Sequence, residues 1–418
     1  MTDIDGYISS LNEFKFDYSL GRIKAILSSL DNPQDAFGVI HIAGSNGKGS
    51  TAAFIEAIFR ASEFKTGLYT SPHINNFRER IAVNGKTAPE NVLLKNVNLL
   101  KKTVKKNSTY LTYFEFMTVL AFLVFRECGV ELAVIEAGLG GRYDATNVNY
   151  AAKLLSVITS VSLEHTQLLG NTKIKILKEK EAIVKGAGLF NLKGNNLRKH
   201  VKKRFGEMAF FPEDYFKVEN TKHNNSGLTA ALRDVKNKHS LKLKLSMHED
   251  VMAQNAAIAL AAADIIKSMD VNIDMKKAVK ALERVKVSGR LQKISKDTFV
   301  SVAHNPEAAD SVFGALAKMS AGKVTYIFSA LKDKDIKSIL RSIKKYRDVQ
   351  LVITSIDNER AESPAVIKKL ADKAGFKSYL EPDNKKALAL ARKIKGRGVI
   401  VIGGSFYLAG KFLIKIVR

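Results

Sequence analysis

The segment from His41 to Thr51, His-Ile-Ala-Gly-Ser-Asn-Gly-Lys-Gly-Ser-Thr, contains residue types that can bind the phosphates of a nucleotide. It follows the apolar run Phe37 to Ile42 and precedes a helical pattern from Ala52 to Ala61, which predicts a strand, a loop and a helix in succession. Glycines allow backbone N–H groups to close around phosphate oxygens, and the N-terminus of the following helix adds partial positive charge. The segment therefore predicts a phosphate-binding loop.

One lysine and two hydroxyl side chains supply the chemistry of this loop. Lys48 would reach the outer phosphates, and Ser50 or Thr51 could bind Mg²⁺. The spacing differs from the usual G-x-x-x-x-G-K-S/T, because only two residues separate Gly44 from Gly47 and a further glycine follows the lysine. The alternative is a glycine-rich turn with an exposed lysine, but here the strand, loop, lysine, hydroxyls and helix all coincide.

Three further polar side chains stand at or just beyond the ends of apolar runs that predict strands: Ser71, Glu136 and His165. In a parallel sheet the carboxyl ends of all strands face one edge, so these side chains would meet the phosphate loop there. A glutamate suits Mg²⁺, which prefers oxygen ligands and usually shares them with phosphates. Singly, each side chain also fits a structural role in a turn or strand end. Their combination predicts a site.

Weaker signals come from four polar segments later in the chain. Leu177 to Ile183 alternates charges, and its pattern alone predicts a solvated helix surface. Ser288 to Arg290, Ala303 to Pro306 and Leu331 to Asp335 are polar turns beside predicted strands. Of these residues, Arg290 could clamp phosphates with two parallel hydrogen bonds.

Apolar runs alternate with helical patterns, which predicts an α/β fold with largely parallel sheets. In the first half the predicted strands are Gly38 to Ala43, Lys65 to Tyr69, Glu131 to Glu136 and Leu154 to Ser160, and the predicted helices include Glu90 to Lys105 and Glu115 to Glu127. After Gly188 the pattern changes. Short pieces at Phe216 to Glu219 and Leu241 to Leu245 predict antiparallel strands on a flank, and helices are predicted at Val251 to Met269 and Asp274 to Glu283.

A second α/β alternation begins near Thr298. Its predicted strands are Thr298 to Ala303, Val324 to Phe328, Gln350 to Thr354, Lys377 to Glu381 and Val399 to Ile402, and a last helix is predicted at Phe406 to Ile416. The domain boundary is expected around Val285 to Lys296, with a short hinge because no long Pro/Gly/Ser linker is present. We therefore expect two domains, residues 1–288 and 289–418.

Composition narrows the class of protein. The chain of 418 residues suffices for two or three domains, and its net charge of +26 favours nucleic acid, an anionic membrane surface or acidic small molecules as partners. No basic tract is interleaved with aromatic residues and no nucleic-acid-binding motif is present, so small polyanionic ligands are favoured. A single cysteine, the absence of a signal-peptide pattern and the absence of a membrane-spanning apolar run predict a cytoplasmic protein without membrane contact.

In this order, these segments resemble the folylpolyglutamate synthase/dihydrofolate synthase family, a branch of the Mur ligase superfamily. The resemblance covers nearly the whole chain and also rests on Phe77 to Ile81, Tyr113 to Glu115, Glu136 to Asn147, Glu179-Lys180 and Asn255 to Ala257. It implies an N-terminal P-loop-type ATPase domain with a mainly parallel sheet and a C-terminal Rossmann-like α/β domain. The active site would lie between the two.

The resemblance also implies roles for individual residues. ATP would be bound by Gly44, Asn46, Gly47, Lys48, Gly49, Ser50, Thr51, Asn255, Arg290 and His304. Mg²⁺ would be held by Ser50, Ser71, Glu136, His165 and Lys180, the last as a carbamate, which turns a cation into a carboxylate-like ligand. The folate or pterin substrate would lie at Tyr113, Phe114, Asp144 and Ala145, and the catalytic residues would be Lys48, Lys180 and His165.

At a few positions this chain departs from the family pattern. Ser301 stands where an aspartate is usual, two residues before the Ala-His pair, and Glu164 replaces the usual aspartate before the histidine. Glu181 and Ala182 stand where alanine and glycine are usual. None of these departures removes an implied metal ligand.

The implied activity is ATP-dependent amide ligation in folate biosynthesis and one-carbon metabolism. ATP would phosphorylate a substrate carboxylate, and the amine of L-glutamate would displace phosphate from the acyl phosphate, since a free carboxylate is a poor electrophile. The acceptor would be dihydropteroate, the γ-carboxylate of tetrahydrofolate, or both. Two alternatives stay open: a Mur-type ligase acting on another carboxylate, and a basic, non-catalytic protein that binds nucleotides or nucleic acid. We expect a monomer that binds small molecules and no nucleic acid.

Overall fold

The first half of the chain builds an eight-stranded sheet. The computed structural model describes residues 3–11, 19–224, 226–319 and 321–413. The strand order is β4-β3-β2-β5-β1-β6-β7-β8, and the centre consists of β1 (Gly38–Ala43), β2 (Thr66–Tyr69), β5 (Leu132–Glu136) and β6 (Lys153–Ile158). These four strands pair in parallel, so their carboxyl ends lie at one edge, as predicted.

Short strands that the sequence pattern did not predict extend this sheet on both sides. β3 (Ile81–Val83) and β4 (Lys86–Thr87) form an antiparallel edge next to β2. β7 (Gly188–Phe190) and β8 (Ala209–Phe210) continue the parallel side next to β6. Strands of two or three residues are too short to show a recognisable apolar period.

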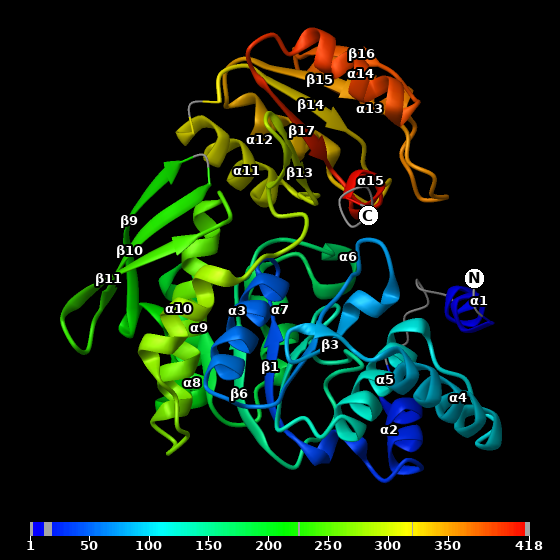
Figure 1. Ribbon diagram of the computed structural model, residues 1–418, viewed down its shortest axis with the longest axis vertical. Coiled ribbons are helices and arrows are strands. Elements are labelled where there is room, and N and C mark those ends of the chain that lie inside the picture. Colours follow the sequence, from blue (N-terminus) through cyan, green and yellow to red (C-terminus); the bar gives the residue numbers. More distant parts are fainter. Residues whose placement is uncertain (1–2, 12–18, 225, 320, 414–418) are drawn as a thin grey trace.

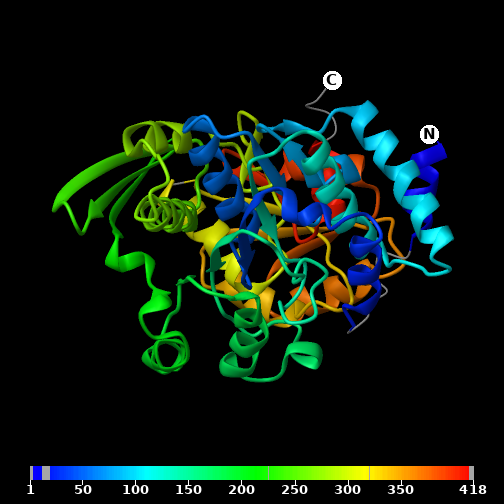
Figure 2. The same ribbon diagram turned by 90° about the horizontal axis from the view of Figure 1, so that it is seen from below.

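Helices cover both faces of the sheet, and the alternation of side chains along β1 divides the core between them. Ile40 and Ile42 pack with α3 (Lys48–Ala61), α9 (Asp250–Lys267) and α10 (Met275–Arg284). Val39 packs with the other layer, α2 (Gly21–Ser28), α4 (Glu90–Lys106) and α5 (Tyr113–Glu127). Figures 1 and 2 show α1 (Asp3–Ser10) beside α4 at the rim of this layer. The helices predicted in these regions are confirmed, with ends shifted by at most two residues except where α3 begins four residues earlier, at Lys48.

A separate antiparallel sheet flanks this domain, as the alternating pieces predicted. It has the order β11-β10-β9, with β9 (Phe216–Asn224), β10 (Gly227–Asp234) and β11 (His239–Leu245). The middle strand was not predicted. Its alternate residues Leu228, Ala230 and Leu232 are buried in the same core as the alanine-rich α9. Figure 1 shows this sheet beside α9 and α10.

The last third of the chain forms a six-stranded sheet with the order β12-β13-β17-β14-β15-β16. Its strands are β12 (Gln292–Ser295), β13 (Thr298–Ser301), β14 (Val324–Phe328), β15 (Val349–Ile353), β16 (Lys377–Leu380) and β17 (Val399–Gly403). All pair in parallel except β12, and the five predicted strands are confirmed. The helices around it are α11 (Pro306–Lys318), α12 (Ile336–Lys344), α13 (Pro364–Lys373), α14 (Asn384–Ile394) and α15 (Phe406–Leu413). Residues 414–416 of the last predicted helix lie outside the described residues.

The connection between the two large sheets is short. It runs from the end of α10 at Arg284 to the start of β12 at Gln292, and the expected boundary at residues 288 and 289 falls within it. The boundary itself stays a prediction. Figure 1 shows the second sheet above the carboxyl edge of the first. The remaining described elements are α6 (Thr166–Leu169), α7 (Lys173–Lys180), α8 (Asn195–Phe205) and the 3₁₀ turns Pro33–Ala36, Phe77–Arg80, Glu181–Ile183, Gly206–Met208 and Pro212–Asp214.

The described ranges contain no helix with both the length and the apolar character needed to cross a lipid bilayer.

The aromatic packing of α5 generates a stability prediction. Phe122 is fully buried, and its ring lies 6.2 Å from that of Phe37 and 5.9 Å from that of Tyr150. We expect Phe122→Ala to cost about 3–5 kcal/mol in unfolding free energy, through lost burial and a residual cavity. Urea unfolding followed by circular dichroism measures this loss. Leu99→Ala, at a position in α4 that is 39% exposed, is the control and should change the free energy by about 0.5 kcal/mol or less. Similar losses for both variants would contradict the assignment of Phe122 to the core.

Candidate active site

The predicted phosphate loop connects β1 to α3, and one of its glycines is required by geometry. Gly47 has φ 83° and immediately precedes α3. A Cβ at this position would lie 2.7 Å from Oδ1 of Asn255, a buried residue of α9. The close approach therefore brings the predicted nucleotide residue Asn255 against the loop, as expected.

The hydroxyls at the start of α3 are buried without hydrogen-bond partners. Ser50 and Thr51 are both fully buried, and neither hydroxyl has a hydrogen-bond partner among the described residues. Buried polar groups are nearly always paired, so two orphaned hydroxyls beside a glycine loop are typical of a site that binds a polar ligand. Lys48 Nζ lies at the same place and donates to the carbonyl oxygen of Gly44 at 3.0 Å.

Glu136 joins the ends of three elements. It ends β5 and is 3% exposed, and its Oε2 accepts from the backbone N–H of Ser71, after β2, at 3.0 Å. The same oxygen would lie 3.2 Å from a Cβ on Gly49 in α3. Burial raises the pKa of Glu136, and the charges of Lys48 and Arg290 oppose that rise, together with the N–H of Ser71. The predicted convergence of Ser71, Glu136 and the loop is confirmed.

Lys180 lies in the core of this region, and the solvated helix surface predicted from the pattern of Leu177 to Ile183 is wrong there. The Lys180 side chain is 1% exposed, and its Nζ lies 2.7 Å from Oε1 of Glu164. Burial lowers the pKa of Lys180, and the Glu164 carboxylate opposes that shift. Glu181 is also fully buried and is held by Arg204 at 2.8 Å. Charge alternation failed as a signal of exposure because each buried charge has a partner from another segment.

His165 stands next to this pair. It is an exposed residue with φ 44° that immediately precedes α6. Partial desolvation and the ammonium of Lys334, from the second domain, lower its pKa, whereas Glu164 raises it. The residue therefore faces groups from both domains.

The second domain contributes Arg290 and His304 beside the phosphate loop. Desolvation and Lys334 lower the pKa of His304 to about 4, so its ring is neutral at pH 7. Its Nδ1 lies 3.0 Å from the carbonyl oxygen of Val302 and must donate to it, which leaves Nε2 as an acceptor. The positive charge of Arg290 acts to lower the pKa of both His304 and Glu136. Ser301, at the position of the expected aspartate, is 2% exposed.

Direct hydrogen bonds connect this loop to the second domain through Asn46. Its Nδ2 donates to Oε2 of Glu307 at 2.8 Å, and its Oδ1 accepts from Nδ2 of Asn305 at 2.8 Å. Asn305 caps α11, so the start of this helix is fixed to the phosphate loop.

The four predicted substrate residues lie around the glycine turn that follows β5. Phe114 covers the turn, because a Cβ on Gly138 would lie 2.7 Å from its ring. Tyr113, Asp144 and Ala145 are 5–6% exposed, and the Arg80 guanidinium stacks 4.9 Å from the centroid of the Tyr113 ring. The structure brings these residues together, although three of them present little surface to a ligand.

Other polar groups at the site had weaker signals or none. Lys334, Asn305 and Arg80 belong to segments that the sequence singled out, but nothing marked those particular side chains. Glu249, at the start of α9, gave no signal. It is 3% exposed, its Oε2 has no hydrogen-bond partner among the described residues, and burial raises its pKa to about 7 against the charge of Arg290.

Two oxygen donors lie at the phosphate loop. In the described ranges, no three His, Cys, Asp or Glu side chains cluster closely enough to hold a metal ion. Mg²⁺ keeps several waters and takes few protein ligands beside phosphates. The buried hydroxyl of Ser50 and the carboxylate of Glu136 are suitable oxygen donors at the phosphate loop.

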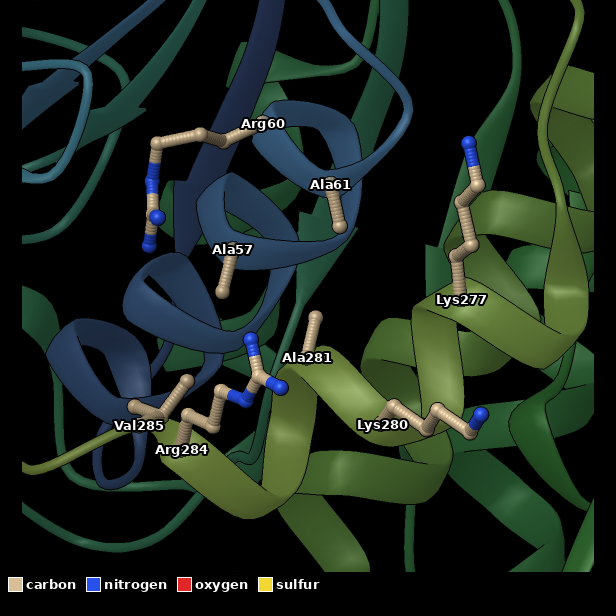
Figure 3. A pocket seen from close by; sticks show the side chains of 8 residues that line it. All are labelled: Ala57, Arg60, Ala61, Lys277, Lys280, Ala281, Arg284 and Val285. Atoms are coloured by element: carbon tan, nitrogen blue, oxygen red, sulfur yellow. The ribbon is translucent and has the colours of Figure 1, made fainter.

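A cavity of about 400 Å³ between α3 and α10 is separate from this site (Figure 3). Its lining residues are Ala57, Arg60, Ala61, Lys277, Lys280, Ala281, Arg284 and Val285. None of them is a predicted site residue. Arg60 pairs with Glu56 at 2.9 Å and Lys277 with Glu63 at 3.1 Å, so two of the four cations already have partners.

Comparison with known proteins agrees with this geometry. Residues 42–263 match the Mur ligase middle domain, and residues 289–406 match the Mur ligase glutamate ligase domain. The chain is 30% identical to a dihydrofolate synthase/folylpolyglutamate synthase of Buchnera aphidicola, with 89% of this chain and 86% of that protein aligned. It is also 30% identical to folylpolyglutamate synthase of Lacticaseibacillus casei, with 98% and 96% aligned.

The fold comparison reaches the same conclusion. The structure of Mycobacterium tuberculosis folylpolyglutamate synthase complexed with ADP matches with a TM-score of 0.89 at 26% identity, covering 99% of this chain and 98% of that chain. Because both sequence and structure align over almost the full length, this chain belongs to the folylpolyglutamate synthase/dihydrofolate synthase family of Mur ligases.

Proposed function

We propose that the protein is an ATP-dependent ligase that joins L-glutamate to dihydropteroate, to the γ-carboxylate of a folate, or to both, with release of ADP and phosphate. One observation carries the proposal: the buried hydroxyl of Ser50, the carboxylate of Glu136 and the cations Lys48 and Arg290 converge from two domains. The names of the relatives support the acceptor class, and the ADP in the mycobacterial structure supports ATP as the phosphate donor.

In this proposal the phosphate loop and the second domain hold ATP between them. The nucleotide residues are Gly44, Asn46, Gly47, Lys48, Gly49, Ser50, Thr51, Asn255, Arg290 and His304. The first turn of α3 presents N–H groups that no intrahelical carbonyl satisfies, which favours phosphate oxygens. Lys48 Nζ would exchange its bond to the Gly44 carbonyl for phosphate oxygens.

Mg²⁺ would be held by Ser50, Ser71, Glu136 and His165, together with Lys180 as a carbamate. When bound, Mg²⁺ neutralises phosphate charge and orients the phosphates toward the acceptor. Formation of the carbamate joins the Lys180 amine nitrogen to the carbon of CO₂ and releases a proton. The product would replace the Lys180–Glu164 ion pair by a second anionic oxygen donor beside His165.

The reaction has two steps. An oxygen of the acceptor carboxylate attacks the γ-phosphorus while the bond to ADP breaks, which gives an acyl phosphate. The amine of L-glutamate then attacks the acyl carbon and loses a proton, and phosphate leaves. Phosphoryl transfer depends mainly on positioning and on neutralised charge, which Lys48 and Arg290 would supply. The second domain above the loop would exclude water, which otherwise hydrolyses the acyl phosphate.

The proposal also covers the domain division, the oligomeric state, the location and the partners of the protein. We propose that it consists of two domains divided at residues 288 and 289, and that it acts as a monomer in the cytoplasm. Its partners would be ATP, L-glutamate and the acceptor, without nucleic acid. Tyr113, Phe114, Asp144 and Ala145 would form the acceptor side of the site.

Glutamate-dependent ADP release tests this function directly. Purified protein is assayed with Mg²⁺, ATP and bicarbonate, with either dihydropteroate or tetrahydrofolate as the acceptor. We expect release with at least one of them, and the acceptor that works identifies the step. If the protein binds ATP but forms no ADP in response to glutamate with either acceptor, the proposal is contradicted. That result would favour a Mur-type ligase with another carboxylate substrate.

Substitution of the loop lysine tests its role in phosphoryl transfer. Lys48→Ala should lower kcat/KM for ATP by about 10³-fold, because a preorganised positive charge at the transferred phosphate is lost. Circular dichroism should be unchanged. The control is Lys277→Ala in α10, whose ammonium is paired with Glu63 away from the site, and this variant should retain wild-type rates. Substantial turnover by Lys48→Ala would disprove the assignment of the loop.

Substitution of the buried lysine tests whether it carries a carbamate. Lys180→Ala should lose activity, and short carboxylic acids should restore part of it by supplying the missing anionic oxygen. Lys178→Ala, an exposed lysine of the same helix, is the matched control and should need no restoration. A crystal structure of the active enzyme with an unmodified Lys180 amine would rule out the carbamate.

A further inference from the structure

We infer that a buried chain of hydrogen bonds, Lys153–His41–Thr146–Asp144, is a positioning device that sets the shape of the glycine turn Gly138 to Asn147 and connects it to the segment of Lys180. The inference rests on the proposed function for the statement that this turn receives the acceptor. It gives Thr146 a role behind the site and adds a positioning role to Asp144 on the acceptor side.

The chain lies beneath the turn, between β1 and β6. His41 projects from β1 and is fully buried, and its Nε2 lies 2.7 Å from Oγ1 of Thr146. Its Nδ1 lies 3.0 Å from Nζ of Lys153, the first residue of β6. Thr146, itself fully buried, donates from Oγ1 to Oδ1 of Asp144 at 2.5 Å. The four side chains therefore form one continuous path from the sheet to the turn.

With Lys153 as the ammonium and Asp144 as the carboxylate, the donors and acceptors of these groups allow one direction for the protons of the chain. An ammonium group can only donate, so Nδ1 of His41 must accept from Lys153. The ring is then neutral with its proton on Nε2, in agreement with burial and Lys153, which lower the pKa of His41. Because the single hydroxyl proton of Thr146 goes to Asp144, His41 Nε2 donates to Thr146 Oγ1. Burial lowers the pKa of Lys153 to about 7 and raises the pKa of Asp144, so this direction belongs to the ammonium and carboxylate forms of the two ends.

The carboxylate of Asp144 is fully used inside the turn. Its Oδ1 also accepts from the backbone N–H of Thr146 at 3.0 Å, and its Oδ2 accepts from the N–H of Leu139 at 2.9 Å. The hydroxyl of Tyr150 donates to the carbonyl oxygen of Thr146 at 2.5 Å. These bonds hold residues 139–146 around the buried carboxyl group of Asp144. The turn therefore has little freedom while the chain of hydrogen bonds is intact.

The same turn is packed on the backbone of the Lys180 segment. The N–H of Arg142 donates to the carbonyl oxygen of Glu179 at 2.9 Å, and a Cβ on Gly141 would lie 2.8 Å from the carbonyl oxygen of Lys180. At the far end of the chain, Lys153 Nζ donates to the carbonyl oxygen of Ile183 at 2.5 Å. Both ends of the chain therefore hold the segment that contains Lys180.

Loss of one member leaves a buried polar atom of a neighbouring member unpaired, such as His41 Nε2 when the Thr146 hydroxyl is removed. Such groups cost more to bury than a hydrogen bond contributes, so the turn would relax to satisfy them. The expected consequence is weaker binding of the acceptor with normal binding of the nucleotide, whose loop hydrogen bonds do not involve this chain.

Substitutions that differ by one polar group test the inference. Thr146→Val removes the hydroxyl and keeps the shape, and we expect the KM of the acceptor to rise about tenfold or more, with the Kd of ADP within about twofold of wild type. Thr146→Ser restores the hydroxyl and should restore the KM. His41→Leu should behave as Thr146→Val does, whereas His41→Gln retains an N–H donor and should be milder. An unchanged acceptor KM, or a fall in kcat alone, would overturn the inference.

Hydrogen exchange supplies a readout that does not depend on activity. In ligand-free Thr146→Val, the amides of residues 139–147 should exchange at least about tenfold faster than in wild type. The matched control is Thr325→Val in β14, which removes a buried hydroxyl that accepts from Gln350 at 2.8 Å in the second sheet. It should leave the turn unchanged. Unaltered exchange in Thr146→Val would overturn the inference even if the wild type is an active ligase. Faster exchange in Thr146→Val, with a wild type that ligates neither acceptor, would place the failure in the proposed function.

Discussion

The site is built around a carboxyl group that lies where water is excluded. Glu136 is almost completely buried at the end of β5, and burial alone favours its neutral form. Three cations oppose that tendency, Lys48 and Arg80 from the first domain and Arg290 from the second. Since part of this compensation comes across the domain boundary, the electrostatics of the carboxylate depend on how closely the second domain approaches. The charge balance at Glu136 is therefore a property of the two-domain arrangement.

Parallel pairing is what makes such a concentration of polar groups possible. The ends of β1, β2 and β5 meet at one edge, so side chains from three distant stretches of sequence converge without any long insertion. Close packing of the backbone then leaves no room for side chains at the turns. Gly47 adjoins Asn255, and Gly141 adjoins the carbonyl oxygen of Lys180. Each glycine lets a neighbouring segment approach until it forms part of the wall of the site.

The sequence was sufficient for the main helices, for the central strands of the two large sheets and for the edge where the site lies, because these follow from local period and from the rule for parallel sheets. It was insufficient wherever a charge is buried by a partner from elsewhere. Lys180 lies in a segment that has the pattern of a solvated helix, and only Glu164, sixteen residues earlier, makes its burial tolerable. The same holds for Glu249, which is buried within reach of the charge of Arg290, and for Asn46, which bonds to the second domain. Such contacts join segments that are distant along the chain, about which local periodicity carries no information.

Asn46 shows how the nucleotide and the domain arrangement are connected. Its amide donates to Glu307 and accepts from Asn305, so a residue of the phosphate loop also holds the N-terminus of α11. The contact is polar and partly solvated, and contacts of this kind between domains permit relative motion. A phosphate group that binds the loop competes for the same amide or reinforces its position. The phosphate loop and the start of α11 therefore share one amide side chain, and the ion pair of Lys318 with Asp250 joins the same two domains.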